Sequence, residues 1–345
     1  MDAKKALSQK IVQQKKSAVK PSKSGLEDLM GLVDLPVMKS KSELVDWASL
    51  LSAMRKKKGP LDFVLPGLPA GTVGSIVSQG ATGKTMLALQ IAFTIAGGPD
   101  ILGLASVDNT WQRKTGKVIF LSAEDSRDIL ERRAYDIGQR LKPSEQETVA
   151  ENLFVGSLVG QDVDIMDFGW YSWIRDEARD ARLIIIDTLR RFHSLDENDS
   201  AQMAHLICRM EKICGETGTT ILFLHHASKV GALSGGDTQQ ASRGSSVLTD
   251  NIRLQLNLTT MSSEQAKSFG VDERCRRRFV RLVFTKVNHS DPVYDFWLRR
   301  REGGVLEPAV LKCEFKASKA SKASKASASK TKASQKEKED GDDRW

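Results

Sequence analysis

Residues 78–85, with the sequence SQGATGKT, have the residue types and spacing of a phosphate-binding loop. The usual pattern is G-x-x-x-x-G-K-[ST], placed between a strand and a helix. Gly83, Lys84 and Thr85 occupy the last three positions, whereas Ser78 stands where the pattern has glycine. A short apolar run precedes the loop, and an apolar segment of helical character follows it. The stretch therefore predicts a nucleotide site, in which a small serine replaces the first glycine.

The chemistry of such a loop is the binding of phosphate groups. Its backbone N–H groups surround the β-phosphate, and the dipole of the following helix adds positive potential. The lysine reaches the β- and γ-phosphates, and the hydroxyl of Thr85 is a ligand for Mg²⁺. We therefore expect ATP and Mg²⁺ to bind here. The predicted nucleotide-binding residues of the loop are Gly80, Ala81, Thr82, Gly83, Lys84 and Thr85.

Two acidic residues at the ends of apolar runs are candidates for the chemistry on ATP. Asp187 ends the run RLIIID, where a carboxylate can hold Mg²⁺ through water. Glu124 ends the run FLSAE, where a carboxylate can act as general base toward water. An acidic pair at a strand end is also a common helix cap, and spacing alone does not separate Glu124 from Asp125. We favour Glu124 as the base, because the loop and Asp187 are expected at the same sheet edge.

The run LFLHH ends in a pair of histidines, and a long polar segment follows it. One histidine can hydrogen-bond the γ-phosphate, or it can cap the strand. Joint metal binding is not expected, since adjacent strand residues point to opposite faces. The segment 229–246 is rich in Gly, Ser and Gln, and a loop of this length inside a domain is usually functional. Its basic residues Lys229 and Arg243 suit a moving loop that binds the phosphate backbone of a nucleic acid.

Several arginines follow this segment. Some of them are expected to be surface charges, but one can reach the γ-phosphate of a neighbouring subunit as an arginine finger. The candidates are Arg253, Arg274, Arg276, Arg277, Arg278 and Arg281.

The pattern of apolar runs predicts an α/β fold with a mostly parallel central sheet and helices on both faces. Short runs rich in Ile and Val alternate with segments of helical character. The predicted strands are 72–79, 117–125, 183–188 and 219–228. Two later runs, 279–287 and 293–300, predict a hairpin added at one edge of this sheet.

The excess of positive charge lies in the two ends of the chain. The formal net charge is +8; residues 1–58 hold 13 Lys and Arg against 6 Asp and Glu, and residues 314–345 hold 9 against 6. Such arms attract polyanions such as nucleic acid, or only keep the chain in solution. We predict a basic N-terminal extension (1–58), a folded domain (59–313) and a disordered Lys/Ala/Ser tail with an acidic end (314–345).

Within the N-terminal extension, residues 41–54 have the spacing of an amphipathic helix, which would pack on its own domain or on a neighbouring subunit. The four cysteines show no metal-ligand spacing, which fits a reducing cytoplasm. No apolar run is long enough to span a membrane, and the basic N-terminus lacks the apolar core of a secretory signal. We therefore expect a cytoplasmic protein.

Taken in order, the strings GATGKT, FLSAED, LIIIDTLRRFH, FLHHASK and QQASRGSSVLTDNIR resemble those of the RecA-like hexameric helicases of the replicative helicase superfamily. Within it they look most like the RepA-type helicases of IncQ-type plasmids, over residues 60–312. The resemblance implies a RecA-like P-loop NTPase core, a homohexameric ring and 5′→3′ translocation on single-stranded DNA in plasmid replication. A plasmid primase and an initiator would be further partners. These helicases also start the loop with serine, so Ser78 is a mark of the subfamily.

The resemblance also implies roles for individual residues. It makes Glu124 the catalytic base, His226 the sensor of the γ-phosphate and Arg253 the arginine finger across the subunit interface. It places Lys84 and Thr85 on the phosphates and Mg²⁺, and Asp187 on Mg²⁺. The remaining site candidates are Arg133 at the nucleotide and, in the DNA-binding loop, Lys229, Arg243, Gly244 and Ser245.

One departure from wider relatives bears on the finger. Lys286 falls where those relatives carry a lysine that acts on the neighbouring subunit, and they place an arginine two residues further on. Asn288 occupies that second position here, which favours Arg253 as the finger.

Two other functions stay open from the sequence. A RecA-type recombination ATPase would form open filaments instead of closed rings. A non-enzymatic, nucleotide-gated DNA-binding regulator would need no general base, so an intact Glu124 argues against it.

Overall fold

The computed structural model describes residues 48–108, 110–226, 247–289 and 295–311. The chain divides into two compact units, Met1–Pro60 and Leu61–Trp345. In the first unit the structure describes one helix, α3 (Leu50–Arg55), and none of its side chains is buried. This helix includes the end of the amphipathic segment predicted at 41–54, whose residues 41–47 lie outside the described ranges.

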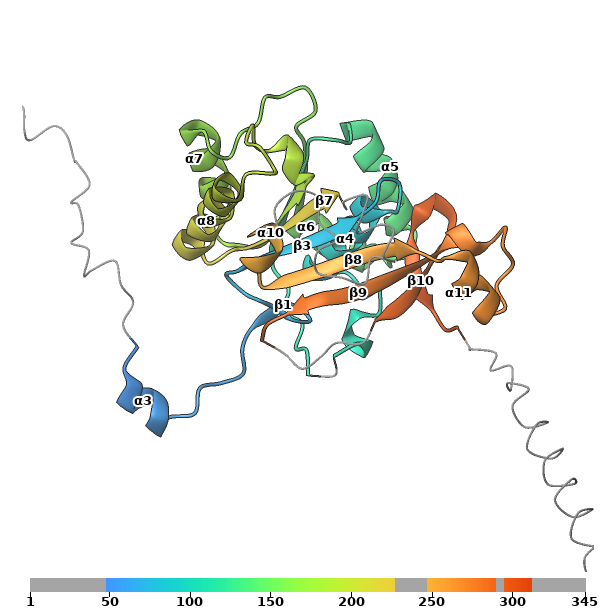
Figure 1. The fold of residues 1–345 in the computed structure, drawn as a ribbon, viewed down its shortest axis with the longest axis horizontal. Coiled ribbons are helices and arrows are strands. Elements are labelled where there is room, and N and C mark those ends of the chain that lie inside the picture. The colour runs from blue at the N-terminus through green and yellow to red at the C-terminus, as the bar shows by residue number, and fades with distance from the viewer. Residues whose placement is uncertain (1–47, 109, 227–246, 290–294, 312–345) are drawn as a thin grey trace, which may run out of the picture. The chain divides into compact units, whose positions relative to one another are not determined.

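The second unit is built on a nine-stranded sheet with the strand order β11-β10-β9-β8-β3-β7-β6-β4-β5 (Figure 1). The pairs from β5 across to β8 are parallel, and those from β8 to β11 are antiparallel. The strands are β3 (Val73–Ser78), β4 (Lys117–Ser122), β5 (Leu153–Ser157), β6 (Ala181–Asp187), β7 (Thr220–His226), β8 (Leu254–Thr260), β9 (Phe279–Val287), β10 (Phe296–Arg300) and β11 (Leu306–Ala309). A separate two-stranded sheet pairs β1 (Phe63–Leu65) with β2 (Leu68–Pro69).

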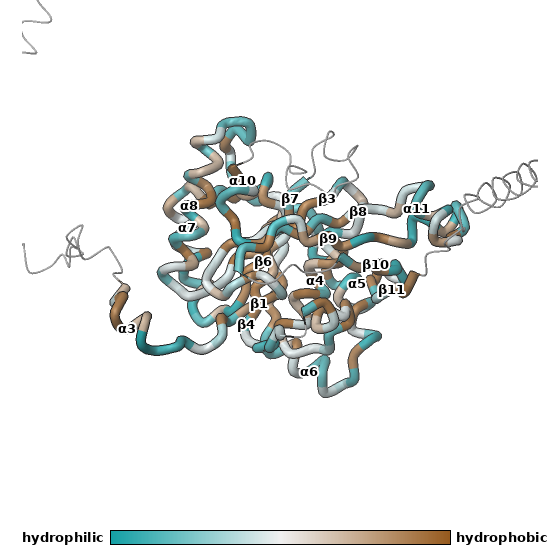
Figure 2. The backbone as a smooth tube through the Cα atoms, turned by 60° about the horizontal axis from the view of Figure 1, so that its bottom comes forward, coloured by the Kyte–Doolittle hydropathy of each residue, from teal (hydrophilic) through white to brown (hydrophobic). Residues whose placement is uncertain are grey.

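Helices cover both faces of this sheet. The helices are α4 (Lys84–Ile95), α5 (Arg127–Gly138), α6 (Pro143–Asn152), α7 (Phe168–Glu177), α8 (Ser200–Thr217), α10 (Val247–Asp250) and α11 (Ser263–Ser268). One core cluster joins α4, α5 and α6 to one face, and a second joins α7 and α8 to the other. Apolar residues gather in the interior of this unit (Figure 2). The predicted α/β class, with a mostly parallel sheet between two layers of helices, is confirmed.

The helices on the two faces differ in their pattern for a physical reason. Helix α8 is amphipathic: Asp199 caps it by accepting from Ala201 N and Gln202 N, and it ends at Gly218, whose φ of 75° favours glycine. Helix α4 is apolar nearly all round, because every residue in it except Thr85 is buried. A helix enclosed in this way lies inside the protein, so it positions the loop before it rigidly.

All six predicted strands are present, including the hairpin of β9 and β10, whereas β5, β8 and β11 were not predicted. In β8, buried apolar residues alternate with buried polar ones, and such alternation is typical of a half-exposed strand. The polar side chains are buried because they bond one another. Thr249 Oγ1 donates to Gln255 Oε1 at 2.9 Å, and Gln255 Nε2 donates to Asn257 Oδ1 at 2.9 Å.

The parallel strands bring the segments that follow them to one edge of the sheet. In the register of the sheet, Ser78 of β3 lies beside His226 of β7, and Ser122 of β4 lies beside Asp187 of β6. Ligand sites of open parallel sheets lie at the carboxyl ends of their strands. None of the described helices is long and apolar enough to cross a lipid bilayer.

The last strand is fixed to the central helix by one side chain. Gln90 of α4 is fully buried. Its Nε2 donates to Leu306 O at 2.7 Å, and its Oε1 accepts from Leu306 N at 2.8 Å. The amide of Gln90 thus satisfies both backbone groups of a residue in β11.

We predict that Gln90→Met lowers the free energy of unfolding by about 2–4 kcal/mol, because two buried backbone groups lose their partners. Chemical denaturation measures the change. Gln146→Met is the matched control, since Gln146 is exposed and makes one bond, to Gly138 O at 2.9 Å. A loss at Gln90 no larger than that of the control would show that this contact does not hold β11.

Candidate nucleotide-binding site

The predicted phosphate-binding loop connects β3 to α4. Gly83 precedes α4 with a φ of 104°, a conformation that favours glycine, and Ala81 has a φ of 60°. Ser78 is not among the residues with positive φ, so its backbone does not require the glycine of the usual pattern. The Ser78 hydroxyl donates to Gln79 O at 2.8 Å. A serine therefore fits the start of this loop without strain.

Lys84, the first residue of α4, folds its side chain back over the loop. Its Nζ donates to Ser78 O and Gln79 O, both at 3.3 Å, and lies 3.4 Å from Nδ1 of His226. Burial lowers the pKa of the Lys84 amine, and the carboxylates of Glu124 and Asp187 partly offset this effect. The cation is thus held where the phosphates of a nucleotide would bind.

His226 joins this lysine to Glu124. Its Nε2 lies 3.5 Å from Oε1 of Glu124, so the network assigns the ring proton to Nε2 and leaves Nδ1 to accept from Lys84. The hydrogen bond from His226 is the main cause that lowers the pKa of Glu124, and burial opposes it. Glu124 is therefore held as a carboxylate, which is the state that a general base needs.

Asp187 ends β6 in a buried position beside the loop. Ser122 Oγ donates to its Oδ2 at 3.4 Å, and its Oδ1 is buried with no hydrogen-bond partner among the described residues. Burial raises the pKa of Asp187 to about 6, whereas the nearby Thr85 hydroxyl lowers it. A buried carboxylate oxygen without a partner, next to a hydroxyl, fits the hard oxygen ligands that Mg²⁺ prefers.

Lys84, His226 and Glu124 line one pocket with a volume of about 370 Å³, whereas Asp187 is not among its lining residues. The structure brings together most of the predicted site: of those residues, Gly80, Ala81, Gly83, Lys84, Thr85, Glu124, Arg133 and His226 line the pocket. Arg133 forms an ion pair with Asp125, 2.8 Å from Nε to Oδ2, so Asp125 serves to hold an arginine at the pocket. Thr82 lies in the same loop and its hydroxyl donates to Gln79 O at 3.0 Å.

Sequence reasoning missed three residues of this pocket, Met86, Arg300 and Gly304. Met86 directly follows the loop, whereas Arg300 and Gly304 come from the last hairpin of the sheet, formed by β10 and β11, far along the chain from the loop. No pattern near Arg300 distinguishes it from Arg299 and Arg301 beside it. Successive side chains of a strand point to opposite faces of the sheet. Once the register of β10 is known, this alternation shows which arginine is on the side of the loop.

Other predicted residues are not brought to this pocket. Arg253 precedes β8, and its N–H donates to Val73 O at 2.8 Å, at the end of β3 opposite the loop. Lys286 lies at the same end, where its Nζ donates to Thr249 O at 2.8 Å and Asp250 O at 2.6 Å. The predicted DNA-binding residues Lys229, Arg243, Gly244 and Ser245 lie outside the described ranges.

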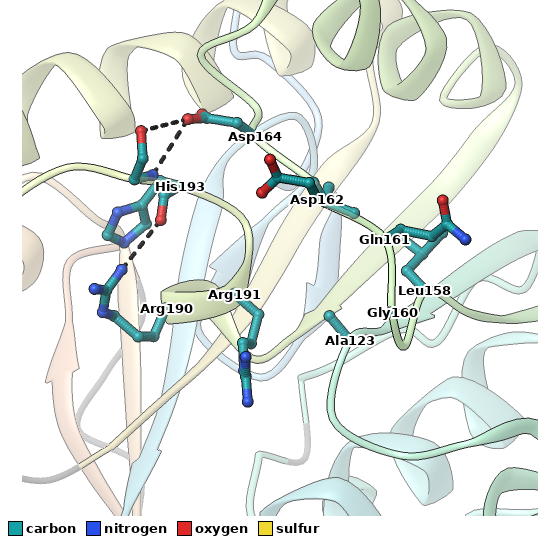
Figure 3. A pocket seen from close by; sticks show the side chains of 11 residues that line it. Ala123, Leu158, Gly160, Gln161, Asp162, Asp164, Arg190, Arg191 and His193 are labelled. Atoms are coloured by element: carbon teal, nitrogen blue, oxygen red, sulfur yellow. Dashed lines mark hydrogen bonds between the residues drawn. The ribbon is translucent and has the colours of Figure 1, made fainter.

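A second pocket, of about 430 Å³, lies next to the turn that carries Glu124 (Figure 3). Ala123, which precedes Glu124, is one of its lining residues. Arg190 Nη1 donates to His193 O at 3.1 Å, and both ring nitrogens of His193 are buried without a partner among the described residues. The charge of Arg191 contributes to the lowered pKa of Glu124. Arg191 lines this pocket, but the hydrogen bond from His226 remains the main cause of the lowered pKa of Glu124.

We predict that Asp187→Asn stabilises the protein in EDTA without nucleotide. The pKa of Asp187 is raised from 3.8 to about 6, so the folded state loses stability as the pH rises from the first value to the second. At pH 7.5 the variant should be more stable by about 2–3 kcal/mol, and near pH 4 the difference should vanish.

Thermal or chemical denaturation at the two pH values measures this difference. Asp162→Asn, a change of an exposed carboxylate, should leave the stability unchanged. A variant at Asp187 that is less stable than the original chain at pH 7.5 would contradict the assignment of a buried, costly charge.

Comparison with known proteins places these residues in a family. A family model described as an AAA domain matches residues 39–232, more than half of the chain. A solved structure described as an ATPase domain is similar over 76% of this chain and 96% of that chain, with 16% sequence identity and a TM-score of 0.49. The segment matched by the family model contains the loop together with Glu124, Asp187 and His226. The chain belongs to the AAA-domain family.

Proposed function

We propose that this protein is an ATP-hydrolysing DNA helicase that moves along single-stranded DNA. The observation that carries the proposal is the connected set of Lys84, His226 and Glu124 beside the buried Asp187, all at the mouth of one phosphate-binding loop. An AAA domain alone accounts for binding of a nucleotide. A carboxylate held ionised beside the phosphate site adds the means to activate water.

The residues that would hold the substrate follow from their positions. The loop from Gly80 to Thr85 and the amine of Lys84 would bind the phosphates. Asp187 and the hydroxyl of Thr85 would hold Mg²⁺, which supplies charge neutralisation at the phosphates when bound. Arg133, held by Asp125, provides a second cation at the rim of the same pocket.

Glu124 would remove a proton from the attacking water, and His226 would control when Glu124 is free to do so. In the structure Glu124 accepts a hydrogen bond from His226. A γ-phosphate offers the imidazole a competing acceptor, so its arrival would loosen this contact and direct Glu124 toward water. After hydrolysis and loss of phosphate the histidine would return to Glu124. The imidazole therefore suits a sensor of the γ-phosphate, as the sequence resemblance implies.

A ring of subunits explains the position of Arg253. Arg253 lies beside the start of β3, and the loop follows the end of the same strand. At the rise of an extended chain, the two ends of β3 are roughly 15–20 Å apart. The guanidinium of Arg253 therefore suits the site of a neighbouring subunit in a homohexamer. Lys286 lies beside it, and the charge of Arg253 contributes to the lowered pKa of this lysine, for which burial is the main cause.

The resemblance supplies the finer parts of the proposal. We infer a helicase similar to the RepA-type enzymes of IncQ-type plasmids, acting 5′→3′ in plasmid replication in the cytoplasm, with a primase and an initiator as partners. The segment 229–246 would contact the DNA, mainly its phosphates. The three-part division at residues 58 and 313 stays a prediction. The alternatives are a RecA-type recombination ATPase and a nucleotide-gated regulator without hydrolysis.

We predict that Lys84→Ala abolishes nucleotide binding and that Glu124→Gln binds ATP but hydrolyses it about 10²–10⁴ times more slowly, because only the second variant keeps the phosphate site. Equilibrium binding and phosphate release in the presence of single-stranded DNA measure the two effects. Glu147→Gln, a change of an exposed carboxylate, is the control. Unchanged DNA-stimulated hydrolysis in Lys84→Ala would refute the proposed function.

We predict that Arg253→Ala lowers kcat by about 10³-fold or more while leaving ATP binding intact, because the finger acts on the transition state. Mixing this variant with Glu124→Gln should restore part of the activity. In mixed rings, an Arg253→Ala subunit supplies an intact Glu124, and a neighbouring Glu124→Gln subunit supplies an intact Arg253. The interface between these two subunits then holds a complete site. Mixed rings that stay inactive would refute action across the interface, and Arg274→Ala should behave like the original chain.

Strand polarity and assembly need a separate measurement. Unwinding of a forked DNA duplex with a 5′ or a 3′ tail, with the subunit mass determined alongside, should show activity on the 5′ tail and a mass of six subunits. Strand exchange without unwinding would favour the recombination ATPase instead.

A further inference from the structure

Arg300 is the last residue of β10, and its side chain reaches the phosphate-binding loop. Its Nη2 donates to Thr82 O at 2.6 Å and lies 3.3 Å from the position that a Cβ at Gly83 would occupy. A larger residue at Gly83 would therefore press on the guanidinium as well as strain the backbone. The loop and the end of the last hairpin fit against each other through this one contact.

The guanidinium of Arg300 has no carboxylate partner among the described residues. Its neighbours in the strand region differ: Arg301 Nε bonds Glu307 Oε2 at 2.8 Å, and Arg299 lies over the ring of Phe279 at 5.7 Å. Burial lowers the pKa of Arg300, and no carboxylate of the described part of the chain opposes the effect. A half-buried cation without a counter-charge is costly unless an anion joins it.

The side chain also lines the nucleotide pocket. Only one of its five N–H donors has a partner among the described residues, the carbonyl of Thr82. Lys84, Thr85 and Arg133 line the same pocket, so the free donors belong to a site that is already built for anions. The planar arrangement of these donors matches the oxygens of a phosphate group.

The surrounding structure holds Arg300 in this position. A Cβ at Gly304, in the turn after β10, would lie 3.7 Å from Met86 Cε, so the turn follows α4 closely. Arg300 pairs in the sheet with Leu306, the residue that Gln90 of α4 holds by two hydrogen bonds. The same helix therefore fixes both the loop and the strand that carries the arginine.

We propose that Arg300 is a phosphate-binding residue of the nucleotide site, which contacts the phosphates of a bound nucleoside diphosphate or triphosphate while holding Thr82 of the loop. The inference rests on the proposed function, since it concerns the same pocket. It assigns to the last hairpin a direct part in nucleotide binding. The matched segment of the AAA domain ends at residue 232 and does not include this hairpin.

Binding of MgADP to the full chain by isothermal titration calorimetry tests the proposal. Arg300→Ala and Arg300→Gln should both weaken MgADP binding by about 10- to 100-fold, the worth of hydrogen bonds to a charged group. Arg300→Lys, which keeps the charge, should bind with intermediate affinity. Arg299→Ala is the matched control, since it removes an arginine from the opposite face of the same strand, and its affinity should not change.

Arg300→Lys and Arg300→Gln together separate phosphate binding from a purely structural role. Both keep an N–H donor on a side chain shorter than arginine, but only lysine keeps the charge, so phosphate binding predicts tighter MgADP binding for lysine than for glutamine. Affinity equal to that of the original chain in Arg300→Gln, or in Arg300→Ala, would overturn the proposal and leave Arg300 as a support of the loop. If Arg300→Ala does not fold, the glutamine and lysine variants decide the question.

The result also distinguishes this inference from the proposed function. If the original chain does not bind MgADP, or binds it as well after Lys84→Ala, the nucleotide site itself is wrong. If Lys84→Ala loses binding and the Arg300 variants do not, only the role of Arg300 is wrong.

Discussion

The enclosure of β3 between two parallel neighbours is the constraint on which the rest of the structure depends. β3 pairs with β7 on one side and with β8 on the other, and every residue in it is buried. Both sets of backbone groups are therefore satisfied, and the strand cannot shift without breaking two ladders. The start of the loop is therefore fixed by the end of β3. The end of the loop is fixed by α4, which is buried nearly all round.

Polar groups gather at the mouth of the loop, where Lys84 and Asp187 are buried and His226 and Glu124 are partly exposed. Lys84, His226 and Glu124 form one chain of contacts, so each satisfies part of the next. Asp187 is the exception, because one of its oxygens has no partner among the described residues and its pKa is raised by burial. Such a cost is typical of a site shaped for a ligand and not for the stability of the free protein.

Much of this site follows from the sequence, because parallel strands place their last residues at one edge. Once four apolar runs are accepted as neighbouring strands, Glu124, Asp187 and His226 must lie near the loop. β8 escapes prediction because its buried polar residues bond one another, which no local pattern reveals. Arg300 escapes because its contact with Thr82 joins residues 218 positions apart, and only the register of the last hairpin shows which arginine of three faces the loop.

The late position of this hairpin has a consequence for the newly made chain. A nascent polypeptide that ends after β7 already contains the loop, both acidic residues and the histidine. Helix α4 then lacks β11, so the amide of Gln90 has no Leu306 to bond and part of an apolar helix stays uncovered. Contacts between residues so distant in the sequence form late in folding. The residues that define the site are thus synthesised early, but the pocket takes its described shape only when the last two strands of the sheet have been added.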